Sequence, residues 1–254
     1  MEAGLVSDPV VVSEDLGGGV LLIRMQDRAN KNTFSDPLIQ GLTEAFAWAG
    51  TRVDCKAVVL TGYDTYFSSG GTQEGLRDLF DGKFKFTDKD LYSLALNCPV
   101  PVISAMQGHG IGGGFVLGLF ADIVVLARES VYTANFMKYG FTPGMGSTFI
   151  LPQKLGIALA EEMMLTADTY RGEDLQKRGA SFQVLPRDQV LERAIELART
   201  LAEKPRISLI ALKDHLVAPL RAALPGFIAQ EIALHEITFH QPEVRGRIEA
   251  LFGR

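Results

Sequence analysis

Four short, nearly continuous apolar runs constrain the fold of this chain most. They occupy residues 20–25, 56–61, 100–106 and 122–127. Such runs are typical of strands whose two faces are both covered by helices. An amphipathic helix follows the first run, with Asp36 as its cap, Pro37 at its first position and an apolar stripe at Leu38, Leu42, Ala45, Phe46 and Ala49. The repeated strand–helix–strand pattern predicts an α/β fold with parallel strands.

The last quarter of the chain has a different pattern. A short strand is predicted at residues 182–185, and no strand pattern follows Pro186. Helices are predicted at 188–201 and 208–216, with a third from near Pro225 and a fourth after Pro242. We therefore place a boundary near residue 195, between an α/β core (1–195) and a helical C-terminal region (196–254).

Charge and cysteine content exclude several classes of protein. The chain has 254 residues, a net charge of -5 and no long run of either sign, which argues against nucleic acid or an anionic membrane as a partner. No apolar stretch is long enough to span a bilayer, and residues 1–4 do not resemble a signal peptide. Cys55 and Cys98 are interpreted as reduced thiols, and no spacing fits a metal site. We expect a cytoplasmic protein.

Two glycine-rich turns carry the strongest functional signal. Residues 66–74 read YFSSGGTQE and residues 107–114 read QGHGIGGG, and each turn follows a strand-like run. Backbone N–H groups in two such turns can point at one oxygen atom, which is how a protein builds an oxyanion hole without side chains.

Two other interpretations of the second turn stay open at this stage. Residues 108–113 fit G-x-G-x-x-G, so the turn could bind a dinucleotide, with Glu129 on a ribose. Alternatively, the glycines could only allow a helix to pack closely on a sheet.

Together with the segment FTPGMG at 141–146, the two turns and their spacing resemble the crotonase (enoyl-CoA hydratase/isomerase) superfamily. The resemblance implies a spiral fold of ββα units with a helical C-terminal trimerisation region. It also implies that the N–H groups of Gly71 and Gly113 hold the thioester oxygen of an acyl-CoA or acyl-carrier substrate. One well-placed donor of this kind is worth about 3 kcal/mol in the transition state.

The two glutamates with which hydratases of this superfamily add or remove water are missing. Their positions correspond to Val116 and Phe136. An inactive homologue is one interpretation of this loss. Decarboxylation of a glutaconyl thioester is another, because loss of carbon dioxide gives a dienolate without any base. That reaction needs a cation to position the carboxylate and an acid to protonate the product.

Two side chains are candidates for those roles. Lys85 lies between two phenylalanines in a segment that follows the first turn. A lysine at an arbitrary position is more simply explained as a solvated side chain, and we interpret Lys83 in this way. His235 lies on the apolar stripe of a predicted helix, with Ile228, Ile232 and Phe239. A histidine there is often only a core residue, but its near-neutral pKa suits a proton donor.

Segments 66–76, 106–110 and 132–140 resemble the polyketide β-branching crotonases. This resemblance implies decarboxylation of 3-methylglutaconyl-acyl carrier protein by Lys85 and His235. It implies no cofactor beyond the phosphopantetheine arm that carries the substrate, and a homotrimer. Further substrate contacts are predicted at Ser69, Gly70, His109, Val116 and Phe136, with His109 interpreted as mainly structural.

Two other functions stay open. A hydratase or isomerase would need a carboxylate near the thioester, for which Glu74 is the one nearby candidate, expected to point into a helix start. A non-catalytic homologue would bind the acyl carrier or CoA without turnover. In either case a basic patch around Arg77, Lys83 and Lys85 would favour an acidic carrier.

Overall fold

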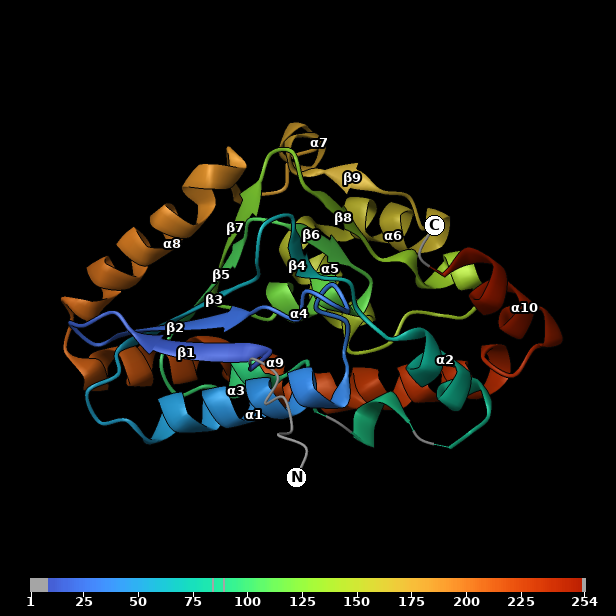
Figure 1. The fold of residues 1–254 in the computed structure, drawn as a ribbon, viewed down its shortest axis with the longest axis horizontal. Coiled ribbons are helices and arrows are strands. Elements are labelled where there is room, and N and C mark those ends of the chain that lie inside the picture. The colour runs from blue at the N-terminus through green and yellow to red at the C-terminus, as the bar shows by residue number, and fades with distance from the viewer. Residues whose placement is uncertain (1–8, 84, 89, 253–254) are drawn as a thin grey trace, which may run out of the picture.

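Six strands form the larger of two sheets in the computed structural model, which describes residues 9–83, 85–88 and 90–252 (Figure 1). Their order is β1 (Val11–Asp15), β2 (Val20–Met25), β3 (Ala57–Thr61), β5 (Val102–Met106), β7 (Ile123–Ala127) and β10 (Gln183–Leu185). Only β1 is antiparallel to its neighbour. The predicted parallel α/β sheet is confirmed.

The smaller sheet shows how the predicted spiral of ββα units is built. Its strands, in order, are β4 (Tyr66–Ser68), β6 (His109–Ile111), β8 (Val131–Thr133) and β9 (Tyr170–Arg171). Strands β4, β6 and β8 each come directly after a strand of the larger sheet, so successive ββα units contribute one strand to each sheet. The predicted ββα arrangement is confirmed. We did not predict the individual short strands, because a strand of two or three residues is too short to show a periodicity.

Helices cover both faces of the larger sheet. The described helices are α1 (Asp36–Thr51), α2 (Gln73–Phe80), α3 (Leu94–Asn97), α4 (Gly113–Leu119), α5 (Ser147–Leu155), α6 (Ile157–Thr166), α7 (Gly172–Lys177), α8 (Arg187–Ala202), α9 (Arg206–Thr238) and α10 (Pro242–Leu251), with 3₁₀ turns at Phe86–Asp88 and Asn135–Tyr139. In β3, Val58 and Leu60 join the core beneath α1, whereas Ala57 and Val59 pack with α8. Burial on both faces is why the strand sequences are continuously apolar.

Two helix predictions need correction. The cap of α1 is Ser35, whose Oγ accepts from Leu38 N at 3.4 Å, while Asp36 is already in the first helical turn. The predicted helices at 208–216 and from Pro225 are one helix, α9, which continues through Pro219 and Pro225. Each proline removes one backbone donor, and the buried side chains along α9 outweigh that loss.

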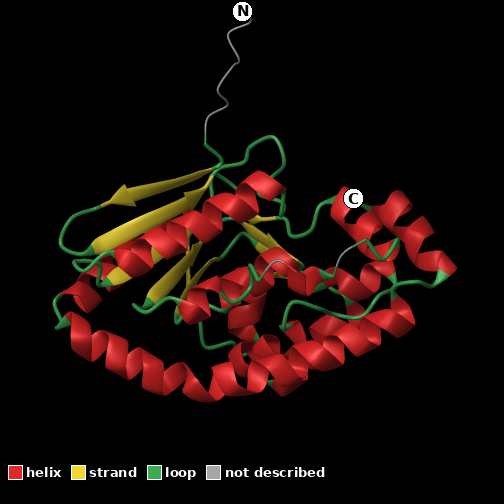
Figure 2. Ribbon diagram, turned by 90° about the horizontal axis from the view of Figure 1, so that it is seen from below, coloured by secondary structure: helices red, strands yellow, loops and turns green. Residues whose placement is uncertain are grey.

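Helix α9 runs along the length of the molecule below the sheets (Figure 1). The strands lie toward one end, and the end that holds the C-terminus is helical (Figure 2). Helix α8 is continuous through residue 195, and the domain boundary there stays a prediction. Within the described residues, no helix is both long and apolar enough to cross a membrane.

Candidate active site

A pocket of about 700 Å³ brings the two glycine turns together with the C-terminal helix. Gly71 and Gly113 both line it, and so does His235 from α9. Much of the remaining wall is apolar and comes from Phe34, Leu76, Leu79, Phe86, Leu91, Phe136, Phe141, Met145 and Phe239. A second cavity of about 430 Å³ lies along α9 and contains none of the predicted site residues.

The two turns lie against each other. A Cβ atom on Gly70 would be 3.2 Å from the nitrogen of Gly113, and Gly70 has a φ of +75°. Gly113 is the first residue of α4, so no carbonyl within its own helix can accept from its N–H. Within the described part of the chain, neither the Gly71 nor the Gly113 N–H donates a hydrogen bond. Both groups are therefore available to an oxygen atom in the pocket.

The carbonyl oxygens of the same two peptide units are held by the fold. Phe34 N–H donates to Gly70 O at 2.8 Å, and that carbonyl shares a peptide unit with the N–H of Gly71. Gly112 O accepts from the N–H groups of Phe115 and Val116 at 3.1 and 3.2 Å. Because a peptide unit is planar, fixing its carbonyl fixes the direction of its N–H. The two donors are thus oriented before any substrate binds.

Asn32 ties the first turn to the core, a role that its sequence context did not indicate. Its buried Nδ2 donates to Phe67 O at 2.9 Å and to Met25 O at 3.1 Å. Ser68 Oγ in turn donates to Asn32 O at 2.8 Å. Asn32 has a φ of +51°, a conformation that asparagine tolerates better than most residues. An asparagine preceding a helix cap was the available signal, but it is too common to single out.

His235 is held by aromatic rings and one carbonyl. Its Nε2 lies 2.8 Å from Thr142 O, and its ring packs edge-on against Phe86, Phe141 and Phe239. Since a carbonyl oxygen only accepts, Nε2 carries a proton. Burial lowers the pKa of His235, against the opposing effect of the Thr142 and Pro143 carbonyls and of Glu236. The neutral imidazole with its proton on Nε2 is therefore favoured at neutral pH.

Lys85 lies outside the pocket wall. Its Nζ is 3.6 Å from Glu236 Oε1, and both side chains are 59% exposed. The next residue, Phe86, does line the pocket and contacts His235. The segment after the first turn therefore reaches the pocket as predicted, but through this phenylalanine. Phe84, the other predicted neighbour of Lys85, lies outside the described residues.

Comparison with known proteins decides the family. The model for enoyl-CoA hydratase/isomerase matches residues 15–252. This chain belongs to that family. It is 62% identical to the bacillaene synthase decarboxylase PksI of Bacillus subtilis over 96% of this chain and 98% of that protein. It is 28% identical to the 2,3-dehydroadipyl-CoA hydratase of Escherichia coli, over 84% of each chain.

Solved structures agree. A chain from a dehydratase/decarboxylase enzyme couple involved in polyketide β-branching is 62% identical and superposes with a TM-score of 0.96, covering 96% of this chain and all of that one. The ECH2 decarboxylase domain of CurF from Lyngbya majuscula is 45% identical, with a TM-score of 0.93 over 96% of this chain and all of the domain. The predicted crotonase-family decarboxylase is confirmed over the hydratase and non-catalytic alternatives.

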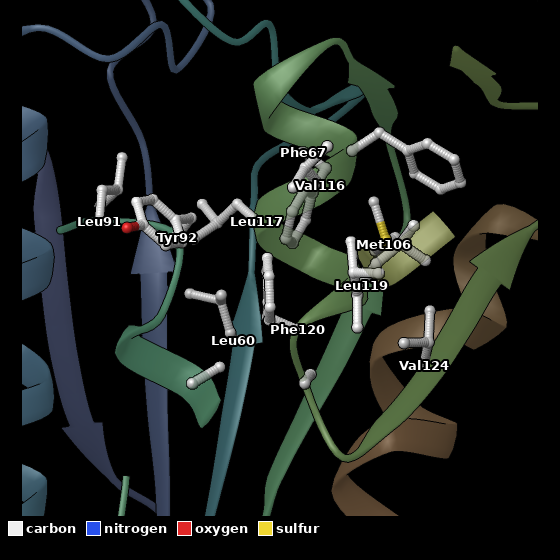
Figure 3. Close-up of a cluster of buried hydrophobic side chains, with 14 of the residues drawn as sticks. Leu60, Phe67, Leu91, Tyr92, Met106, Val116, Leu117, Leu119, Phe120 and Val124 are labelled. Atoms are coloured by element: carbon white, nitrogen blue, oxygen red, sulfur yellow. The ribbon is translucent and has the colours of Figure 1, made fainter. Parts of the chain in front are cut away.

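Phe136 and Val116, which occupy the positions of the two hydratase glutamates, have different surroundings. Phe136 lines the pocket. Val116 is fully buried on α4 and lies beside Phe67 in a cluster of core side chains, not among the pocket-lining residues (Figure 3). The predicted contact between Val116 and substrate is therefore absent from the pocket wall, because α4 turns this side chain toward the core.

Three other predicted contacts also lie outside the pocket wall. Ser69 and Gly70 contribute backbone bonds that hold the first turn. His109 Nδ1 accepts from Val131 N at 3.0 Å, which agrees with the structural role we expected. Glu129, the ribose partner in the dinucleotide interpretation, accepts instead from Arg187 N at 3.1 Å. None of these residues is among those that line the pocket.

The predicted pattern of charge near the pocket also needs correction. Glu74, which we expected to point into a helix start, lies in the first turn of α2 and lines the pocket, and two further carboxylates, Asp36 and Asp78, line it as well. Their helices, α1 and α2, both begin beside the pocket. The described lining residues include no lysine or arginine. The predicted basic patch is balanced by acids: Arg77 pairs with Glu249, Lys83 with Asp78 and Asp81, and Lys85 with Glu236.

Proposed function

We propose that this protein decarboxylates a 3-methylglutaconyl group carried by an acyl carrier protein of a polyketide synthase, giving a 3-methylcrotonyl-type thioester. The observation that carries the proposal is that the N–H groups of Gly71 and Gly113 have no acceptor among the described residues and lie in one largely apolar pocket with His235. The decarboxylases that this chain resembles support the choice of reaction.

The two glycine turns, here called the oxyanion turns, stabilise the negative charge that forms during the reaction. The thioester oxygen accepts from the N–H groups of Gly71 and Gly113. The carbon–carbon bond to the distal carboxylate then breaks, carbon dioxide leaves, and the electron pair moves through the double bond onto the thioester oxygen. Because the donors are oriented in advance, they stabilise the growing charge without reorganisation. No base is required, since no proton is removed.

His235 supplies the proton that completes the reaction. His235 takes up a proton from solvent, donates it in the imidazolium form to the terminal carbon of the dienolate, and returns to the neutral form. Burial favours that neutral form, so donation is downhill for the histidine. The surrounding rings of Phe86, Phe141 and Phe239 limit access of water to the dienolate.

Lys85 positions the substrate carboxylate in this proposal. Its present partner, Glu236, is the residue after His235 on α9, so the ammonium group lies at the same part of the helix as the acid. An exposed ion pair is weak, and a substrate carboxylate can replace Glu236 as the partner. Lys83 is the alternative, but it already contacts both Asp78 and Asp81.

The assembly we propose is a cytoplasmic homotrimer that meets the carrier protein at the pocket mouth. Helix α9 exposes several large apolar side chains: Ile207, Leu212, Leu216, Phe227, Leu234 and Ile237. Scattered apolar residues are normal on a surface, but six on one helix favour a subunit contact. The substrate's phosphopantetheine arm is the only prosthetic group that the proposal needs.

Intact-mass spectrometry of 3-methylglutaconyl-carrier protein tests the reaction. We expect the wild type to cause a loss of about 44 Da, and His235→Gln to slow that loss by about a hundredfold, the range of a missing general acid. His215→Gln, on the exposed side of α9, is the matched control. A gain of about 18 Da would instead indicate water addition and would refute the proposed reaction. Unchanged mass would refute it as well.

A further inference from the structure

One face of α9 holds the segment 142–148 at three points. Glu231, His235 and Thr238 are spaced four and three residues apart, so they share a face of the helix. His235 Nε2 donates to Thr142 O, and Thr238 Oγ1 accepts from Thr142 N at 3.3 Å. Glu231 binds the other end of the segment. The helix that carries the proposed acid therefore also fixes the carbonyl that orients it.

Glu231 is the strongest of these anchors. Its side chain is 1% exposed, and its two carboxylate oxygens accept from Gly146 N at 2.7 Å, Thr148 N at 2.8 Å and Thr148 Oγ1 at 2.5 Å. The described residues provide it with no lysine or arginine partner. Burying an unpaired carboxylate is costly, so three directed donors are the compensation.

The anchored segment connects the acid to the oxyanion turn. A Cβ atom on Gly144 would be 2.7 Å from His235 Cε1, and one on Gly113 would be 2.5 Å from Met145 Sδ. Residues 144 and 145 therefore fill the space between the imidazole and the second oxyanion donor. Met145 has a φ of +63°, a strained conformation that persists only where its surroundings impose it.

We propose that Glu231 is a positioning residue for decarboxylation: by anchoring segment 142–148 to α9, it sets the Thr142–His235 hydrogen bond and the place of the imidazole beside the oxyanion turn. This inference rests on the proposed role of His235. A purely structural role, as the cap of α5, is the competing explanation, since Gly146 at the cap position has no side chain.

Glu231→Gln is the decisive variant. It preserves shape, but its amide NH₂ would face at least one of the three donors, so one hydrogen bond becomes a donor–donor contact. Thr148→Val is the milder variant, because it removes only the hydroxyl donor and spares the carboxylate. Asp174→Asn is the matched control: Asp174 accepts from Arg171 N at the start of α7, a helix that contributes no residue to the pocket.

Three kinds of measurement are made on the full chain: the thermal midpoint, the steady-state kinetics of decarboxylation (kcat and KM), and the ¹⁵N NMR signals of the His235 ring, assigned with His235→Gln. We expect Glu231→Gln to lower kcat about tenfold with KM within about twofold, and to shift the His235 signals away from the Nε2–H pattern. Thr148→Val should do the same to a smaller extent. Asp174→Asn should lower the midpoint alone.

The outcomes separate the two proposals. Unchanged His235 signals in Glu231→Gln and Thr148→Val would overturn the inference, as would a loss of kcat that Asp174→Asn reproduces at equal loss of stability. If the signals shift while His235→Gln remains fully active, the anchoring role stands and the proposed acid is wrong.

Discussion

The two glycine turns and the segment that carries Lys85 prepare for the substrate in different ways. The Gly71 and Gly113 N–H groups are oriented by backbone bonds to the carbonyls of their own peptide units, and the nitrogen of Gly113 also lies against Gly70 of the other turn. The Lys85 ammonium is 59% exposed and holds one partner at 3.6 Å. The stabilisation of charge is therefore built into the fold, whereas the positioning of the carboxylate depends on a side chain that changes partners.

The largest effect is expected where the two turns meet. A Cβ atom on Gly114 would lie 2.2 Å from Ser68 O, a backbone atom that cannot move aside alone. Gly114→Ala should push the turns apart, abolish measurable decarboxylation and destabilise the protein by about 1–3 kcal/mol. Gly246→Ala is the control, because nothing lies within 4 Å of its added Cβ. Activity and denaturation midpoint are measured on both, and an active Gly114→Ala variant would refute the rigid-turn account.

Lys85→Ala should have a smaller and different effect. Removing the proposed partner of the substrate carboxylate should lower kcat/KM by about tenfold or more. Because this attraction is electrostatic, added salt should also lower kcat/KM of the wild type. Stability should change little, since exposed ion pairs contribute about 0–1 kcal/mol. Lys83→Ala is matched in exposure, at 62% against 59%, and should be nearly neutral. The opposite ranking of the two variants in steady-state kinetics would reassign the role to Lys83.

These two regions also differ in how far the sequence predicts them. The two turns could be predicted from the sequence because their glycines form clusters at 70–71 and 112–114. The core stripe of α1 could be found because helical spacing is a local property. The hydrogen bond from Phe34 N to Gly70 O and those from Gly146 N and Thr148 N to the Glu231 carboxylate could not be predicted, since each joins segments far apart in the chain.

The same reasoning explains where the structure departs from the sequence pattern. Val116 occupies the position of a hydratase glutamate by its place after the glycine turn, but the rotation of α4 turns its side chain toward the core. Helix α9 was divided at proline because local propensity disfavours proline inside a helix, while tertiary packing along 33 residues overrides it. Such outcomes depend on contacts that no window of the sequence contains.

A moderate effect is expected at the tether of the first turn. Ser68→Ala removes both the donor to Asn32 O and the acceptor of Gly70 N, which should cost about 1–2 kcal/mol and lower kcat severalfold. Ser104→Ala is an unusually close control, because Ser104 is equally buried and its Oγ has no hydrogen-bond partner. Equal behaviour of the two variants in urea unfolding and turnover would show that the tether is unimportant.

The smallest effect concerns pH and tests the burial of His235 itself. Burial lowers the folded-state pKa of His235 from its ordinary value of 6.5, so below that pH the unfolded chain binds more protons than the folded one. Stability should therefore fall as pH drops through about 6.5 toward the folded pKa, and should be unaffected above it. His235→Gln should remove this part of the dependence, whereas His240→Gln, at an exposed site, should keep it. Parallel stability–pH curves for wild type and His235→Gln would mean that the imidazole is solvated in the folded protein. The aromatic rings around His235 would then not separate the proposed acid from water.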